Sequence, residues 1–233
     1  MRFRTVNNYC LVVPKLDDLI SGKNMVSVKY DFENEQIDVK DIRVMMEMWR
    51  KQNQSYLEIL FTKHKIITPK YKEFMNNILN LKNDIVKMNL PQLARCISGM
   101  SKEKVEALEH EYPATIDKIQ KYGYDPKQLA SIIRLTHLIE NLFENHVSFD
   151  KAIWYDNKEL REYMLNIKRG KTSLEDARQL AALYDSKTEA IKNVVVEQYG
   201  KECFDDKIYE ALQEQVYALV KFAIIENVKA CAI

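Results

Sequence analysis

Apolar residues change their spacing near residue 38. Residues 5–13 end in a β-branched and aromatic run, and residues 25–32 alternate apolar with polar side chains. Both patterns are typical of β-strands, the first buried and the second half-buried. A helical turn is expected at residues 16–20 and a polar turn at residues 33–36. The chain is therefore predicted to begin with two or three strands.

From Asp38 onward the apolar residues have the period of a helix. Either Asp38 or Asp41 can cap the first helix, whose apolar stripe consists of Ile42, Met45, Met46 and Trp49. Asn53 is expected to end this helix. Ser55 and Glu58 then have the spacing of a capping box, which predicts a short second helix.

Everything after Thr62 is predicted to be helical. Prolines, glycines and caps separate the helices, and Thr172 or Ser173 is expected to cap one of them. The helices are expected at roughly 69–81, 91–98, 101–110, 114–121, 125–145, 173–199 and 204–231. The predicted fold class is α+β and predominantly α, with a small N-terminal sheet packed on a larger multi-helix domain. The predicted domains are residues 1–62, an α/β core, and residues 63–233, a helical domain.

The sharpest local signal is a helix start at Asp125. Gly123 suits the positive φ of a turn, and the Asp125 carboxylate can accept hydrogen bonds from the first helical N–H groups. Pro126 suits the first helical position, where a backbone N–H has no partner within the helix. These three residues together predict a helix that begins at residue 125.

One face of this helix carries Lys127, Ser131 and Arg134, which lie at positions i, i+4 and i+7. Two cations and a hydroxyl near a helix N-terminus suit an anionic ligand such as a phosphate. An ordinary solvated helix face has the same composition. The spacing by itself is compatible with both interpretations.

A second basic stretch follows about thirty residues later and holds Lys168, Arg169 and Lys171. Together with Lys127 and Arg134, these side chains are candidate phosphate contacts for nucleic-acid binding. Such a role requires local clustering, because 35 basic and 34 acidic side chains give a net charge of only +1. The overall charge excludes a strong general attraction to nucleic acid or to an anionic membrane.

Other composition signals indicate a cytoplasmic protein that does not cross a membrane. No apolar run reaches the ~18 residues of a membrane span, and the histidines lack the spacing of a zinc site. The cysteines are far apart and are expected to be reduced thiols: Cys10, Cys96, Cys203 and Cys231. The helix at 204–231 becomes apolar nearly all round at residues 222–225, so burial against its own chain or in a homodimer is expected.

Several stretches of the chain share their order and spacing with one family: residues 11–14 with 16–19, 37–43, 57–62, 123–135 and 167–171. Over roughly residues 5–190 the chain resembles phage and bacterial nucleotidyltransferases of the DNA polymerase β superfamily. The resemblance implies a small α/β core followed by helices, and two-metal transfer of a nucleotide from a nucleoside triphosphate. It also implies that Lys127 and Arg134 face the triphosphate.

The residues at the catalytic positions differ from those of that family. The family opens with a glycine–serine turn, which the sequence from Met1 is not expected to supply, and Thr5 and Asn7 stand where the family has two aspartates. Two Mg²⁺ ions about 4 Å apart need several anionic oxygens, which Thr and Asn do not provide. Asp38 falls at the third acidic position and is the candidate metal ligand, with helix capping as its other interpretation. Ser131 replaces a histidine found in many relatives.

The expected function is binding without catalysis. The chain is predicted to be a nucleotidyltransferase-like pseudoenzyme without a cofactor that binds a protein or RNA partner, as a phage-type regulator or an inhibitor of a host defence system. The alternative is an active enzyme that uses Mg²⁺ and a nucleoside triphosphate to modify RNA or protein. Its metal ligands would then lie among Asp17, Asp18, Asp31 and Asp38, or the chain would be a fragment of a longer active protein.

Overall fold

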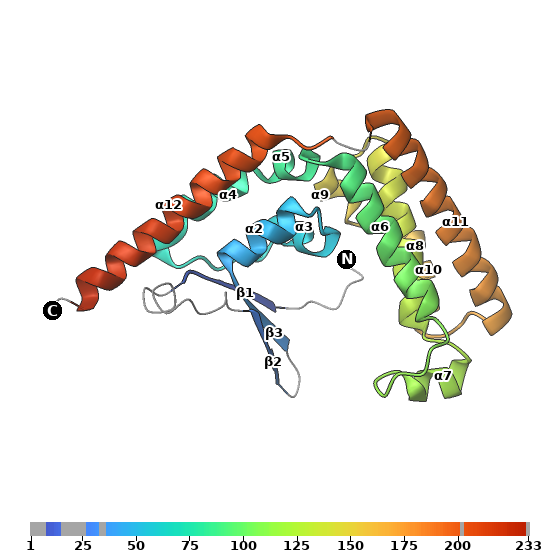
Figure 1. The fold of residues 1–233 in the computed structure, drawn as a ribbon. Coiled ribbons are helices and arrows are strands. Elements are labelled where there is room, and N and C mark those ends of the chain that lie inside the picture. Colours follow the sequence, from blue (N-terminus) through green and yellow to red (C-terminus); the bar gives the residue numbers. More distant parts are fainter. Residues whose placement is uncertain (1–7, 15–26, 33–35, 201–202, 232–233) are drawn as a thin grey trace. The chain divides into compact units, whose positions relative to one another are not determined.

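The computed structural model describes residues 8–14, 27–32, 36–200 and 203–231, and confirms an α+β fold that is predominantly α (Figure 1). Contacts divide the chain into two compact units. Among the described residues, the sheet-containing unit comprises those up to Asn89 together with those from Phe204 onward, and the helical unit comprises those from Leu90 to Cys203. The predicted boundary after residue 62 divides the chain differently. It concerns the extent of the predicted α/β core, and it stays a prediction.

The sheet has three strands in the order β1-β3-β2: β1 is Asn8–Val12, β2 is Ser27–Asp31 and β3 is Gln36–Asp41. The central strand β3 runs parallel to β1 and antiparallel to β2. The first two strands were predicted, and their described residues confirm them. The helical turn expected at residues 16–20 lies outside the described residues.

The helical period was expected from Asp38 onward, with Asp38 or Asp41 as the cap. Residues up to Asp41 instead form strand β3, and the Asp41 alternative is confirmed. Residues 37–41 alternate apolar with polar side chains, and strands on both sides satisfy their backbone groups. Helix α2, Ile42–Arg50, starts only after the strand. Its N-cap is Asp41, whose Oδ1 accepts a 2.8 Å hydrogen bond from the Arg43 backbone N–H. The capping role proposed for Asp38 is therefore incorrect.

The apolar stripe predicted for α2 is confirmed, since all four of its residues are buried: Ile42, Met45, Met46 and Trp49. Helix α3, Gln54–Leu60, follows after a short turn. Its N-cap is Asn53, which accepts from the Ser55 N–H at 3.1 Å. The predicted capping box at Ser55 is thus wrong, and Asn53 starts a helix rather than ending one.

The sheet-containing unit is completed by short helices and by the C-terminal helix: η1 Pro69–Tyr71, α4 Lys72–Asn80, α5 Lys82–Lys87 and α12 Asp206–Cys231. Helix α12 packs on α2, α4 and α5. Most of its predicted apolar stripe is buried: Leu212, Val216, Leu219 and Ala223. Its other side exposes Tyr217, Ile225 and Val228. The homodimer through this helix stays a prediction, which a sedimentation measurement of mass tests.

The helical unit contains α6 Leu90–Glu106, α7 Ile116–Tyr122, α8 Pro126–Phe143, α9 Phe149–Ala152, α10 Lys158–Lys168 and α11 Leu174–Tyr199. Helices α6, α8 and α11 lie side by side and pack on one another (Figure 1). The predicted cap of α11 is confirmed at Ser173, whose Oγ accepts from the Asp176 N–H at 3.1 Å.

A single helix, α6, replaces the two that were predicted at residues 91–98 and 101–110. The serines in the middle do not break it, because their hydroxyls donate to carboxylates of α11. Ser98 Oγ lies 2.7 Å from Glu189 Oε2, and Ser101 Oγ lies 2.7 Å from Asp185 Oδ1. These two serines instead join α6 to α11.

A glycine in the helical unit allows close packing that any side chain would prevent. Gly170 follows α10 with a φ of +70°, and a Cβ at this position would lie 2.3 Å from Cε1 of Tyr122. We expect Gly170→Ala to lower the free energy of unfolding by about 1–3 kcal/mol, because it combines backbone strain with overlap against a ring. Thermal denaturation followed by circular dichroism measures the change.

Gly99→Ala is the matched control, since Gly99 lies within α6 and no atom would come within 4 Å of the added Cβ. Alanine is the better helix former, so this variant is expected to gain about 0.5–1 kcal/mol of stability. Equal melting temperatures for the two variants would contradict the close contact between Gly170 and Tyr122.

Candidate functional site

The start of α8 confirms the helix signal predicted at residue 125. Gly123 ends α7 with a φ of +81°, and Asp125 is the N-cap of α8 with Pro126 in the first turn. Asp125 Oδ1 accepts from the Lys127 N–H at 3.0 Å and lies 3.6 Å from Lys118 Nζ. The Asp125 side chain is buried. Its carboxylate therefore already stabilises the helix N-terminus that was expected to attract a phosphate.

The turn before α8 packs against the loop between α10 and α11. The Tyr124 hydroxyl donates to the carbonyl oxygen of Thr172 at 3.1 Å, and the Tyr124 side chain is fully buried. Tyr122 lies against Gly170, and a Cβ on Gly123 would contact Leu174 at 3.0 Å. Two basic stretches that are far apart in sequence are brought together by these contacts.

Three cations converge where the two stretches meet. Lys127 and Arg134 lie on α8, and Lys168 ends α10, which packs on α8. Burial lowers the pKa of the Lys168 ammonium, and the positive charges of Lys127 and Arg134 lower this pKa further. We call these three residues the cation cluster. The structure thus joins Lys168 to the face predicted from spacing on α8.

The other three predicted contact residues are placed differently. Ser131 Oγ donates to the Lys127 carbonyl oxygen at 2.8 Å, so its proton is used within α8. Arg169 Nη1 lies 3.1 Å from Glu162 Oε1, and both side chains are exposed. Lys171 is exposed in the loop after α10. These residues border the cluster in sequence, and their roles as ligand contacts stay predictions.

The electrostatics of the cation cluster favour a bound anion. Like charges close together raise the free energy of the folded protein, and partial burial of Lys168 reduces the screening by water. A phosphate between the cations would relieve this repulsion and accept charge-assisted hydrogen bonds. The cations, rather than the capped start of α8, therefore provide the attraction for an anion.

The carboxylates considered as metal ligands are only partly described. Asp38 lies in the middle of β3, opposite Tyr9 on β1 and Lys29 on β2. Asp31 ends β2, and its Oδ1 accepts a hydrogen bond from Gln36 Nε2. Thr5, Asn7, Asp17 and Asp18 lie outside the described residues. Within the described part of the chain, His, Cys, Asp and Glu form no group of three that could hold a metal ion.

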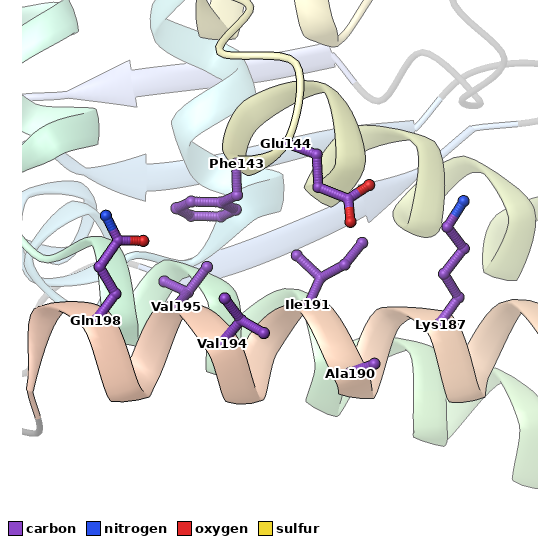
Figure 2. Close-up of a pocket in the computed structure, with 8 residues that line it drawn as sticks. All are labelled: Phe143, Glu144, Lys187, Ala190, Ile191, Val194, Val195 and Gln198. Carbon is purple, nitrogen blue, oxygen red and sulfur yellow. The ribbon is translucent and has the colours of Figure 1, made fainter.

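A shallow hollow of about 180 Å³ lies elsewhere in the helical unit, between the end of α8 and α11 (Figure 2). Phe143 points from α8 toward Ile191 and Val195 of α11, and Glu144 and Lys187 border the hollow. Its lining is largely apolar and includes no member of the cation cluster. The hollow is therefore separate from the site predicted by the sequence.

His137 has a structural environment on α8. Its Nδ1 lies 3.2 Å from the Tyr155 hydroxyl, and its ring meets the rings of Tyr155 and Tyr184 edge-on. Burial is the largest effect on its pKa, which it lowers, so the imidazole stays neutral near pH 7. These contacts explain His137 as a packed aromatic residue of the helical unit.

Sequence reasoning missed the residues that bring the cluster together, namely Tyr122, Tyr124 and Thr172. The available signal was a glycine in each basic stretch, at residues 123 and 170, because a positive φ often accompanies close backbone approach. That signal does not identify the partner of either glycine. The pairing became visible only in the folded chain.

Comparison of the chain with protein-family models, with curated proteins and with solved structures gives no match. The class shown by the structure is a predominantly helical α+β protein. Across the described residues, every helix is too short or too polar to cross a membrane.

Removal of one neighbouring charge tests the cation cluster directly. We expect Lys127→Gln to raise the pKa of Lys168 toward 10.5, because one of the two repelling charges disappears. NMR titration of the lysine side chains measures this pKa. Lys158→Gln is the control, since Lys158 is an exposed residue at the other end of α10.

The same repulsion has a defined effect on stability. The folded-state pKa of Lys168 lies below its unfolded value of 10.5, so the unfolded chain binds more protons between these two values. Stability from this group therefore rises with pH across that window, and the repulsion is fully present at neutral pH. Lys127→Gln is expected to be slightly stabilising at pH 7. A Lys168 pKa that does not respond to Lys127→Gln would show that the two ammonium groups are not close.

Proposed function

We propose that the chain is a nucleotidyltransferase-like protein that binds a phosphate-bearing partner through the cation cluster. The observation that carries this proposal is the convergence of Lys127 and Arg134 on α8 with the half-buried Lys168 at the end of α10. The resemblance suggested a phosphate-facing role for the first two residues from sequence. The third comes from a separate basic stretch, which supports a common ligand.

The chemistry of the three side chains favours a phosphate over a carboxylate ligand. A guanidinium binds two phosphate oxygens at once, and two ammonium groups can share the remaining negative charge. A phosphate carries more negative charge than a single carboxylate does. The same chemistry occurs in a free nucleotide and in RNA, and the experiment below separates these two sources.

Binding, rather than nucleotide transfer, is supported by the residues at the catalytic positions suggested by the resemblance. Thr5 and Asn7 are neutral there, so they cannot offset the charge of two metal ions. A role as a phage-type regulator, or as an inhibitor of a host defence system, belongs to this proposal through the resemblance. In that role the cation cluster would bind the phosphates of an RNA partner or of its nucleotide.

One observation favours the second candidate, an active nucleotidyltransferase. Asp38 does not cap a helix but lies at the centre of the middle strand β3. The resemblance assigns a carboxylate at this position to a metal. In this candidate function, Asp38 with Mg²⁺ and a nucleoside triphosphate would carry the chemistry.

Arg134→Gln combined with Lys168→Gln tests phosphate binding. Each charge-assisted hydrogen bond is worth about 1.5–3 kcal/mol, so affinity for ATP or for a single-stranded RNA oligonucleotide should fall by at least about tenfold. Calorimetry measures ATP binding and fluorescence anisotropy measures RNA binding. Weaker binding of both ATP and RNA identifies a shared phosphate site, whereas weaker binding of RNA alone assigns the cluster to nucleic acid.

The control is Lys158→Gln with Arg161→Gln, which removes the same charges from the beginning and middle of α10. It should keep the wild-type affinities. Lys127→Gln replaces an exposed side chain and repeats the test without replacing the half-buried Lys168. Equally reduced affinities in the test and control variants, or no binding by the wild-type protein at low salt, would refute phosphate recognition at the cluster.

Asp38→Asn distinguishes the enzymatic candidate. The wild-type protein is incubated with Mg²⁺ or Mn²⁺, labelled nucleoside triphosphates, and RNA or protein acceptors. Under the binding proposal neither protein transfers label, and both bind ATP equally. The binding proposal would be overturned if the wild-type protein transferred label and Asp38→Asn, at an unchanged melting temperature, did not. Catalysis would then be the function.

A further inference from the structure

A second basic surface lies in the sheet-containing unit, in the connection between α3 and α4. We call residues 62–72 the basic segment. It contains four lysines and one histidine: Lys63, His64, Lys65, Lys70 and Lys72. The nearest carboxylates in sequence are Glu58, which is buried, and Glu73, at the start of α4. The segment is therefore strongly positive although the whole chain is almost neutral.

Most residues of the basic segment are exposed. Residues 63–66 are all exposed, and Ile66 has a relative exposure of 104%. Residues 62–68 are neither helix nor strand, so their backbone is not held in a sheet or a helix. An apolar side chain so fully exposed between cations has no packing role within its own unit. It is positioned to contact a partner.

The positive surface extends beyond the segment to the following helices. Lys82 on α5 lies with its Nζ 5.2 Å from the centre of the Phe61 ring. Partial burial lowers the pKa of Lys65, and the charge of Lys82 lowers it further. At the other end of the segment, Lys70 Nζ lies 4.9 Å from the centre of the Tyr71 ring. A cation thus lies against an aromatic ring near each end of the segment.

This arrangement suits a linear polyanion better than a compact one. The lysines follow one another along the chain, two in the irregular part and two in η1 and at the start of α4. Nucleic-acid backbones present phosphates at regular intervals, and their bases offer flat apolar faces to a side chain such as Ile66. Exposed bases occur in single strands, while paired bases are stacked inside a duplex.

Other anionic partners fit less well. Stable attachment to a membrane surface requires a broad apolar face in addition to charge, and the basic segment offers a single fully exposed apolar side chain. An acidic protein segment would pair with the lysines but would not use Ile66 next to them in a specific way. We propose that the basic segment, with Lys82, binds single-stranded RNA.

This surface is independent of the cation cluster because it belongs to the other unit and uses none of the same residues. RNA binding at the basic segment does not require that the cluster bind phosphate. Phosphate binding by the cation cluster likewise does not require RNA binding at the basic segment. Measurements on variants of each surface, made in parallel, therefore assign any RNA affinity to one surface, to the other, or to both.

Lys63→Glu combined with Lys65→Glu tests the proposal. The probe is a fluorescent single-stranded RNA of about 20 nucleotides, titrated with the intact chain at several salt concentrations. We expect affinity at low salt to fall by at least about tenfold, and the slope of log affinity against log salt to become shallower by about 1.4, or about 0.7 for each lysine that no longer neutralises a phosphate. Ile66→Ser keeps the charges and should weaken binding by a smaller factor.

The matched control is Lys151→Glu with Lys158→Glu, which changes the charge equally at two exposed positions of the helical unit. It should bind RNA like the wild-type protein. Circular dichroism and the melting temperature should be the same for all variants, because the exchanged side chains are exposed. A double-stranded RNA of equal length should bind more weakly than the single strand.

Several results would overturn the proposal. Equal weakening in the test and control variants would show a general charge effect, and undetectable RNA binding by the wild-type protein at low salt would remove its basis. Preferential binding to anionic vesicles or to a polyglutamate peptide would assign the segment to another partner. A reduced RNA affinity only in Arg134→Gln with Lys168→Gln would leave the cation cluster as the RNA site and exclude the basic segment.

Discussion

The close contact between Gly170 and Tyr122 is the constraint on which the arrangement of the helical unit depends. A ring occupies the space where any other residue would place its Cβ, so the end of α10 can approach the turn before α8. The buried Tyr124 then reaches the Thr172 carbonyl oxygen. The last turn of α10, which carries Lys168, lies directly before the Gly170 contact. The absence of a side chain at Gly170 thereby allows charges from two distant stretches of the chain to lie close together.

The gathered charges have an energetic cost that is consistent with binding. Lys168 is partly removed from water and repelled by Lys127 and Arg134, both of which disfavour its charged form. Strain of this kind is common at sites that receive a ligand of opposite charge. The Asp125 carboxylate does not offset it, because it accepts from the start of α8 and lies beside Lys118.

The two basic surfaces differ in geometry. The cation cluster is compact and includes a half-buried ammonium, whereas the basic segment is extended along the chain and largely accessible. A compact site favours a ligand that concentrates negative charge in a small volume. An open series of lysines favours a long ligand whose charges are regularly spaced. A protein with a net charge of +1 can therefore have two distinct affinities for phosphate. Overall composition does not reveal them, because acidic residues elsewhere balance the total.

The sequence by itself determined the features that depend only on residues close together in the chain. The helix start at Asp125 follows from a cap and a proline, and the stripe of α2 follows from apolar period, so both were predictable. Strand β3 was missed because the helical stripe of α2 begins directly after it at Ile42 and Asp38 resembled a helix cap. Only pairing with β1 and β2 decides between strand and helix. Likewise, the sequence already named Lys127, Arg134 and Lys168 as candidate contacts, but the position of Lys168 beside the other two depended on contacts between residues far apart in the chain. Local chemistry specifies helix ends and faces, whereas the tertiary structure decides which faces meet and where their charges gather.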